Sequence, residues 1–366
     1  MAFTILIAIF SLIILIVLHE LGHFIIAKWC GVAIEEFGIG YPPRLFGKKI
    51  GETFYSLNLI PLGAFVKVKG EEGEAGGSIE DCRSFVGKPL WQRALIVLGG
   101  VLSFWVIAFI LLSVAFGLGI PQAISDEEEV PFGNPKVQIL ALLPHSPAER
   151  AGLRIGDTII EMKGPHYSLK NVNKVKEVQE FIRSHKGEKI VLTIERGKEV
   201  FDVSLTPRLS PPEGEGPIGV LLVRTALVKE PWWEAPLKGI QATGRITGLW
   251  IIGLTQAIWN LLSAQKLPPG ASLMGPVGIG ALMSQAVQVG LSYYLEFVAL
   301  ISIGLAISNI LPIPALDGGK LLFLLIEKIK GSPVNAKIEQ KITAFSFALL
   351  IALLIWITIK DIQRLL

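Results

Sequence analysis

Four stretches of the chain consist almost wholly of apolar residues, and they dominate its pattern of hydrophobic and polar positions. The first begins at Ala2, and the second lies between Arg93 and Asp126. Each holds close to the ~20 residues that a helix needs to cross ~30 Å of hydrocarbon. We therefore predict a multi-pass α-helical membrane protein with four spans, within residues 1–30, 93–120, 297–319 and 342–360.

A fifth uncharged stretch, Ile246 to Gln265, is more polar than these four. Its polar side chains are Thr247, Thr255, Gln256, Asn260 and Ser263. If this stretch crossed the membrane as a fifth span, Asp317 would lie at the face opposite to His19, whereas an amphipathic helix on the outer surface leaves the two residues at the same depth. We expect 210–295 to be a linker with amphipathic helices on the outer membrane surface.

The positive charges orient these spans. Lysine and arginine are frequent in 31–92 and between the last two spans. By the positive-inside rule both segments are cytoplasmic, so the N-terminus and the long middle segment, about 121–295, lie outside. The formal net charge is only +3, and no basic stripe indicates a nucleic-acid partner. Two cysteines without a CxxC indicate neither a disulfide framework nor a thiolate zinc site.

The first span contains the polar sequence His19-Glu20-Leu21-Gly22-His23. Ionisable side chains are costly in hydrocarbon, so they suggest a function by default. Residues i and i+4 share a helix face, so His19 and His23 can bind one metal ion while Glu20 reaches its water. A catalytic zinc site needs a third protein ligand and an open position. The alternative is that these side chains only pair with other helices.

Asp317 is the best candidate for the third ligand. It follows Pro312 and Pro314, which interrupt an apolar helix, and precedes two glycines. Irregular backbone at membrane depth is tolerated where it lines a cavity. With four spans, Asp317 arrives on the cytoplasmic side, at the depth of His19. Taken alone, it could equally be an acid that terminates a helix.

These motifs resemble the site-2 protease family of intramembrane zinc metalloproteases, in particular its regulator-of-sigma-E protease branch. The similar segments are HELGH at 19–23, SLNLIPLGAFVKV at 56–68, MGPVGI at 274–279, NILPIPALDGG at 309–319 and LLFLLIEKIKG at 321–331. The resemblance implies Zn²⁺ bound by His19, His23 and Asp317, with Glu20 as the catalytic base. It also implies that Asn309 holds substrate or stabilises the tetrahedral intermediate.

The chain departs from the family in two places. Gly99-Gly100-Val101-Leu102-Ser103 stands where the family often has Gly-Pro-x-x-Asn, so a role for the missing proline and asparagine is in doubt. Well-known members of the branch have two PDZ domains, and this chain has room for one.

Residues 135–209 have the pattern of a soluble α/β domain. HSPAERAGLRIGDTIIEMKG, from His145 to Gly164, resembles the PDZ signature of bacterial periplasmic proteases. We predict two strands around a turn in Lys189–Leu205 and a helix over 175–185. This PDZ-like domain either binds a peptide by strand addition or only blocks access. His145, His166 and His185 are expected at its surface.

Residues 53–70 have strand-like sequence on both sides of Pro61-Leu62-Gly63, which predicts a β-hairpin. The resemblance implies a membrane re-entrant hairpin beside the active site. A helical substrate must unwind before hydrolysis, and a strand edge can accept the unwound segment. Leu57, Leu59, Leu62 and Phe65 would then contact substrate. Alternatively, the hairpin only packs against the spans.

We therefore predict a zinc metalloendopeptidase that cuts within the transmembrane segment of single-pass proteins. By resemblance, its substrates are anti-sigma factors and remnant signal peptides, and it resides in the bacterial inner (plasma) membrane. Two other classes remain open. A scaffold with structural zinc needs no base such as Glu20, and a metal transporter needs further ligands in other spans.

Overall fold

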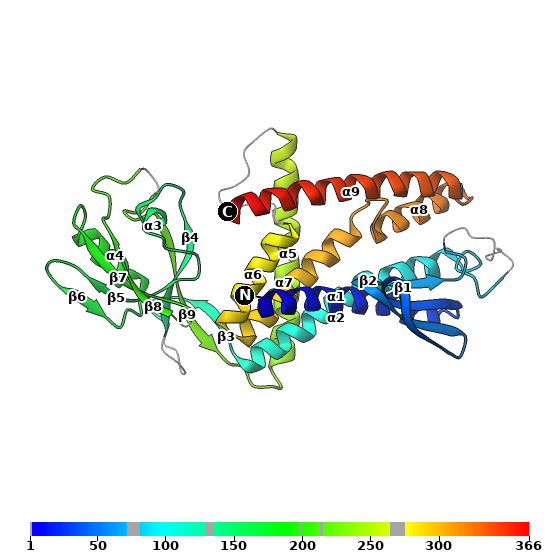
Figure 1. Ribbon diagram of the computed structural model, residues 1–366, viewed down its shortest axis with the longest axis horizontal. Helices are drawn as coiled ribbons and strands as arrows, with labels where there is room; N and C mark the ends of the chain where they lie inside the picture. The colour runs from blue at the N-terminus through cyan, green and yellow to red at the C-terminus, as the bar shows by residue number, and fades with distance from the viewer. Residues whose placement is uncertain are drawn as a thin grey trace. The chain divides into compact units, whose positions relative to one another are not determined.

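The structure of the protein, a computed structural model, describes residues 2–71, 81–128, 135–197, 199–212, 215–263 and 275–365, which form two units (Figure 1). The first is mainly helical and comprises Met1–Ser113, Pro236–Ser284 and Leu295–Leu366. The second comprises Val114–Ala235 and Gln285–Tyr294 and contains a large β-sheet.

Long apolar helices make up most of the first unit. Helix α1 spans Ala2–Trp29, α2 Leu90–Leu118, α7 Leu291–Ile310 and α9 Ala336–Leu365. In the part of the chain that the structure describes, four helices are long and apolar enough to cross a membrane: Leu6–Trp29, Leu90–Leu118, Leu291–Ile310 and Ala336–Gln363. The structure thus has four candidate membrane helices, the number that the sequence predicts.

Glycines bring α1 and α2 close together. A Cβ atom on Gly22 would lie 2.4 Å from the carbonyl oxygen of Gly99, so only glycine fits there. Small residues at such crossings let helix backbones approach closely inside a membrane. On α7, the hydroxyl of Ser302 donates to the carbonyl oxygen of Phe104 at 2.7 Å, which connects α7 to α2. Helix α2 thereby contacts both α1 and α7.

The third predicted span, 297–319, differs in its bounds from the observed helix. Helix α7 ends at Ile310, and a new helix, α8, covers Asp317–Lys330. Pro312 and Pro314 lie in the break, because proline lacks an N–H group and clashes with the preceding helical turn. The end of the predicted range is therefore a tight connection followed by the first residues of α8.

The predicted hairpin over 53–70 is wrong in its pairing. Strand β2, Thr53–Val68, pairs throughout with β1, Ile34–Ile50. One part of the register runs from Ile34↔Val68 to Ile39↔Ala64, and another from Ile50↔Thr53 to Arg44↔Asn58. The two halves of β2 thus both pair with β1. The upstream strand was missed because its proline and glycine residues hide the alternation of apolar positions.

Helix α5, Ala235–Leu262, is not among the four candidate spans, as expected from its polar residues. In Figure 1 it crosses α1 and α9 instead of running alongside them. Its Thr247 hydroxyl accepts a hydrogen bond from Trp105 of α2 at 3.1 Å. Residues 264–274, including Met274 of the MGPVGI motif, lie outside the described residues. Helix α6, Pro276–Val289, follows them.

The second unit is built on one sheet with the strand order β3-β9-β4-β5-β7-β8, and β6 pairs with β5. The strands are β3 (Ile120–Ile124), β4 (Lys136–Leu142), β5 (Thr158–Lys163), β6 (Ser168–Lys170), β7 (Ile190–Arg196), β8 (Glu199–Leu205) and β9 (Val220–Val228). Helices α3 (Pro147–Arg150) and α4 (Val175–Ser184) complete it. Buried side chains such as Ile139, Ile159, Phe181 and Leu192 form its apolar core.

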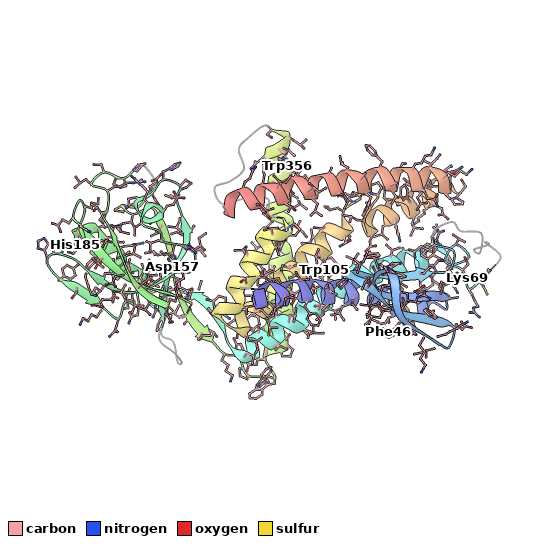
Figure 2. All side chains as sticks on the ribbon, viewed as in Figure 1. Phe46, Lys69, Trp105, Asp157, His185 and Trp356 are labelled. Carbon is pink, nitrogen blue, oxygen red and sulfur yellow. The ribbon has the colours of Figure 1, made fainter. Side chains whose placement is uncertain are left out.

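The predicted elements inside this unit are confirmed, but its extent is larger than expected. Strands β7 and β8 pair from Ile190↔Leu205 to Arg196↔Glu199. Strands β3 and β9 lie outside the predicted domain, 135–209, so the segment after 209 is not only linker and surface helices. The surface prediction for His185, which is labelled in Figure 2, is also wrong: its side chain is buried, and its ring centroid lies 4.3 Å from that of Phe181.

Candidate metal centre

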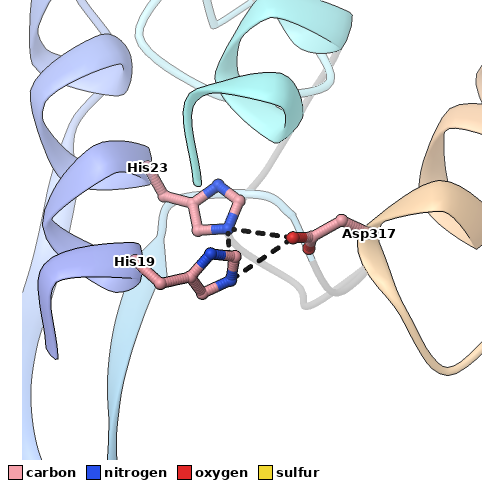
Figure 3. Close-up of side chains that lie close together, drawn as sticks. All are labelled: His19, His23 and Asp317. Atoms are coloured by element: carbon pink, nitrogen blue, oxygen red, sulfur yellow. Dashed lines mark hydrogen bonds and ion pairs between the residues drawn. The ribbon is translucent and has the colours of Figure 1, made fainter. Parts of the chain in front are cut away.

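Three potential ligands converge where α1 meets the start of α8. His19 and His23 are one helical turn apart on α1, and their Nε2 atoms are 3.3 Å apart. The Asp317 Oδ2 atom lies 3.3 Å from His19 Nε2 and 3.5 Å from His23 Nε2 (Figure 3). The structure therefore brings together all three residues that the sequence singled out as metal ligands.

The spacing of these three atoms fits a tetrahedral zinc ion. Ligands at the usual zinc distances, about 2.0–2.1 Å, lie about 3.3 Å from one another at tetrahedral angles. In the part of the chain described, the Asp317 Oδ2 atom is buried without a hydrogen-bond partner. Leaving such an atom unpaired is costly, so a cation between these groups is the expected partner.

Helix α2 fixes the two imidazole rings. The His23 Nδ1 atom lies 2.9 Å from the carbonyl oxygen of Ile96, which selects the tautomer with a proton on Nδ1 and a free lone pair on Nε2. One helical turn after Ile96, Gly100 faces the same ring: a Cβ there would lie 2.1 Å from His23 Nε2, too close for the ring to stay where it is. Another turn on, Phe104 stacks on the His19 ring, with centroids 4.6 Å apart. One face of α2 thus orients both histidines.

Two glycines let the chain turn sharply into α8, where Asp317 is the first residue. A Cβ on Gly318 would lie 2.1 Å from the carbonyl oxygen of Leu311, and one on Gly319 would lie 2.4 Å from that of Ile313. The break after α7 therefore folds directly over the start of α8. This close packing holds the Asp317 carboxylate against α1.

Two ion pairs anchor α8 at its ends. Arg93 of α2 lies 2.8 Å from Glu327, and both side chains are mostly buried. Lys320 lies 2.6 Å from Glu71, which follows β2. The side chain of Lys320 is about half exposed, and its pairing with Glu71 raises the pKa of Lys320 above its usual range. Lys320 is thus a fixed positive charge close to Asp317.

Glu20 lies beside the ligands on α1 and is half-buried. Its carboxylate interacts electrostatically with His23, Asp317 and Lys320. A carboxylate next to a metal site can accept a proton from water without itself binding the metal.

The residues predicted to contact substrate lie in different surroundings. Leu57 and Leu59 are about half exposed on β2, and Leu57 lines an apolar groove of about 420 Å³ between α1 and the β1–β2 sheet. Phe65 packs inside that sheet, against Gly38 and Tyr41. The Leu62 side chain lies outside what the structure describes.

Asn309 is on the last turn of α7, where its side-chain amide donates to the carbonyl oxygen of Leu305 at 2.9 Å. None of the contacts among the described residues joins it to the ligand cluster.

Sequence reasoning missed the contributions of α2 and Lys320. The sequence held a signal for each of them: Gly99-Gly100 interrupts an apolar span, and Lys320 directly follows two glycines. The glycine pair was considered only as a departure from Gly-Pro-x-x-Asn. That Gly100 faces His23 depends on how two helices cross, which spacing within one helix does not reveal.

Comparison with known proteins agrees with this chemistry. The sequence profile of peptidase family M50 matches residues 7–353. The chain is 33% identical, over 95% of both chains, to a protein of Clostridium perfringens named as a zinc metalloprotease. It is 28% identical to the zinc metalloprotease RasP of Geobacillus kaustophilus, over 96% of this chain and 95% of the relative.

A chloroplast membrane metalloprotease of Arabidopsis thaliana is 29% identical over 95% of this chain and 77% of its own length. The match therefore extends over both units and includes the segments that carry His19, His23 and Asp317. The chain belongs to peptidase family M50, the site-2 proteases, and is a multi-pass membrane zinc metalloprotease.

Proposed function

We propose that this metalloprotease hydrolyses a peptide bond within the transmembrane segment of single-pass membrane proteins. The observation that carries the proposal is the position of the ligand cluster. His19 and His23 belong to the candidate span Leu6–Trp29, and Asp317 reaches them from the start of α8. A protease whose metal ligands lie on a membrane helix acts most directly on a substrate that is also in the membrane.

In this proposal His19, His23 and Asp317 hold the zinc ion, and Glu20 is the general base. Zinc supplies a Lewis acid that polarises the scissile carbonyl and makes water easier to deprotonate. The Glu20 carboxylate accepts the proton of the attacking water and later delivers it to the leaving amine. The Ile96 carbonyl and Phe104 keep the two imidazoles in place. Lys320 is one of the charged groups whose field acts on Glu20.

The substrate segment must be unwound before its carbonyl groups become accessible, and the β1–β2 sheet offers an apolar surface for it. The groove between α1 and this sheet is lined by Leu21 and Phe24 of the metal-bearing helix and by Leu57 of β2. Leu57 would contact the substrate there, and the substrate contacts predicted from the sequence for Leu59 and Leu62 belong to the same proposal. Asn309 would hold the substrate backbone. We assign Phe65 to the same surface through its packing with Tyr41.

The remaining parts of the proposal concern topology and substrates. The β1–β2 region re-enters the membrane from the cytoplasmic side, where the metal site also lies. The N-terminus and the PDZ-like domain are extracytoplasmic, and the protein resides in a bacterial inner (plasma) membrane. The substrates are anti-sigma factors and remnant signal peptides, trimmed first by another protease. Charge distribution and family resemblance support these assignments.

The test compares the wild type and Glu20→Gln, both purified in detergent. Each is assayed for cleavage of the same fluorescently labelled single-pass helix. Glutamine preserves the shape of the side chain but accepts no proton, so we expect zinc to stay stoichiometric and cleavage to fall by about 10²–10⁴-fold. Glu180→Gln, on the exposed face of α4, is the matched control and should cleave normally. Equal cleavage by Glu20→Gln would remove Glu20 as the base.

A second substrate set separates intramembrane from general proteolysis. The same cut site is offered in two substrates. In one it lies in a membrane-inserted helix, and in the other it lies in a soluble, unfolded peptide whose remaining apolar residues are replaced by polar ones. The proposal requires the inserted helix to be cut preferentially. Preference for the soluble peptide would contradict it.

A further inference from the structure

Helices α8 and α9 are joined by a short connection (Figure 1). Gly331 adopts the left-handed conformation that ends many helices, and its amide donates to the carbonyl oxygen of Glu327 at 2.9 Å. The Asn335 side chain accepts a hydrogen bond from the amide of Lys337 at 2.9 Å, which caps the start of α9. Local contacts therefore fix both helix ends.

Helix α8 has an exposed apolar stripe near its end. Its opposite face, which includes Phe323, is buried in the helical unit. By contrast, Leu325 is 52% exposed and Ile329 is 79% exposed, and these two residues are one helical turn apart on the same face. Successive residues of a helix are about 100° apart, so Lys328 lies on one side of this stripe and Lys330 on the other. Two lysines thus flank an exposed apolar surface.

The first turns of α9 have a similar composition. Lys337 and Lys341 are exposed and one helical turn apart, and Phe345, another turn along, is 74% exposed. Ile338 and Ile342 are exposed beside them. Both helices therefore carry lysines next to exposed apolar side chains where they are joined. We call four residues the hairpin lysines: Lys328, Lys330, Lys337 and Lys341.

The acidic side chains of this region lie on its inner side. Glu327 pairs with Arg93 of α2, and both side chains are mostly buried. Glu339 of α9 is half-buried and interacts electrostatically with Lys320 and Arg93. Among the residues that the structure describes, the hairpin lysines form no ion pair. The exposed side of the connected helix ends is therefore positively charged and apolar at once.

A membrane surface that contains anionic lipids fits this combination. Lysine side chains lay their aliphatic stems along apolar groups while the ammonium group reaches the headgroups. Clusters of about four to eight basic residues next to a membrane helix attract acidic headgroups. The exposed apolar face of α9 also continues from Phe345 through Leu349 to Leu353, inside its candidate span. Lipid surrounds that span, so the same lipid layer is the expected neighbour of the helix ends.

We propose that the hairpin lysines bind the headgroups of anionic phospholipids, with Leu325, Ile329 and Phe345 in contact with the adjoining acyl chains. The ligand class is a phospholipid with a net negative headgroup, such as phosphatidylglycerol. Lipid binding at this surface is independent of hydrolysis. Because Asp317 is the first residue of α8, the same helix has the proposed metal ligand at one end and the lipid site at the other.

The test places a donor fluorophore beside the hairpin lysines of the full-length chain. The label is attached at Ser332→Cys, an exposed position in the connection, with Cys30→Ser and Cys82→Ser in the background. This parent protein is reconstituted in phosphatidylcholine nanodiscs. Acceptor-labelled phosphatidylglycerol or phosphatidylcholine, with the label on the same acyl chain, is then titrated, and energy transfer gives their affinity ratio. Both leaflets have the same composition, so the result does not depend on the orientation of the protein.

The decisive variant is Lys328→Gln with Lys330→Gln. Each lysine near an anionic surface contributes roughly fivefold to binding, so the preference for phosphatidylglycerol should fall by about 25-fold at low salt. Lys328→Arg with Lys330→Arg keeps the charge and should keep the preference. Lys170→Gln with Lys186→Gln removes the same charge from exposed positions of the sheet unit, so this matched control should bind like the parent protein.

The parent protein should bind phosphatidylglycerol in preference to phosphatidylcholine, and unlabelled phosphatidylglycerol should displace the labelled lipid. Equal affinity for the two lipids would overturn the proposal, as would an unchanged preference in the double glutamine variant. Displacement of labelled phosphatidylglycerol by the same concentration of inorganic phosphate would assign the lysines to free phosphate and would likewise contradict it.

Discussion

Two aspartates, one in each unit, contrast a structural carboxylate with a proposed metal ligand. Asp157 of the sheet unit is fully buried, and its two oxygens accept hydrogen bonds from Arg196 at 2.6 and 2.7 Å and from the Arg154 amide at 2.8 Å. Among the described residues, the buried Oδ2 of Asp317 in the helical unit has no hydrogen-bond partner and lies near the Nε2 atoms of two histidines. The first carboxylate has its hydrogen-bond partners within the chain, and the second has the unpaired oxygen that the proposed metal ion would bind.

The difference follows from the environment of each unit. The sheet unit has a water-exposed surface on which Arg196 can keep part of its guanidinium solvated while it pairs with Asp157. The helical unit contains four candidate membrane spans, where ionisable groups are costly and are retained mainly for function. A polar cluster at those spans therefore indicates a catalytic or metal-binding function more strongly than the same residues on a soluble sheet do.

The largest expected effect comes from removing the unsatisfied carboxylate. Asp317→Ala leaves two zinc ligands, so we expect loss of stoichiometric zinc and a fall in cleavage on the order of a thousandfold or more, which corresponds to about 4 kcal/mol of transition-state stabilisation. Metal analysis of the purified protein and cleavage of the labelled helix measure both. Full zinc in Asp317→Ala would remove this residue from the site.

Asp157→Ala should disturb stability without disturbing the metal. Removing one partner of a buried ion pair costs about 3–5 kcal/mol, and the lower end applies because Arg196 is partly exposed. Hydrogen exchange of β5 and β7 should accelerate while zinc content stays unchanged. Asp202→Ala, on the exposed side of β8, is the control and should change little. Loss of zinc in Asp157→Ala would show that the comparison between the two aspartates is false.

Gly100→Ala tests whether α2 positions the metal ligands. The added Cβ would lie 2.1 Å from His23 Nε2, so the imidazole must move. We expect zinc affinity to fall by about 10–100-fold, the usual cost of disturbing the groups that orient metal ligands. Competition for zinc with a chelator measures this affinity. Gly253→Ala is the matched control, because no atom lies within 4 Å of its added Cβ. Equal affinity in the two variants would exclude this role of α2.

The smallest effect is expected from a satisfied carboxylate inside the helical unit. Asp361 of α9 is buried and accepts hydrogen bonds from the amides of Gly275 and Gly278 at 2.8 Å, which caps the start of α6. Asp361→Ala should destabilise that helix start by about 1 kcal/mol, typical of a lost cap, and leave zinc binding unchanged. Hydrogen exchange at Gly278 measures this, with Gln363→Ala as the exposed control. If Asp361→Ala lost zinc, then burial within the helical unit, and not the lack of a hydrogen-bond partner, would be the feature that identifies the metal ligands.

The sequence alone determined the features that depend on local patterns. Apolar length predicted four membrane helices, because hydrocarbon thickness fixes how many apolar residues a helix needs. Helical spacing placed His19 and His23 on one face, and Pro312 and Pro314 predicted the break before Asp317. The β7–β8 hairpin and α4 were also predictable from alternation and helical periodicity.

The tertiary structure decided what depends on contacts between distant segments. The face of α2 that orients His23, the pairing of both halves of β2 with β1, and the addition of β3 and β9 to the sheet all join residues far apart in the chain. Within one segment, Gly100 is only a small residue in an apolar helix. Its role arises because α1 and α2 cross at that point, and an apolar pattern specifies which face is buried but not which neighbour covers it.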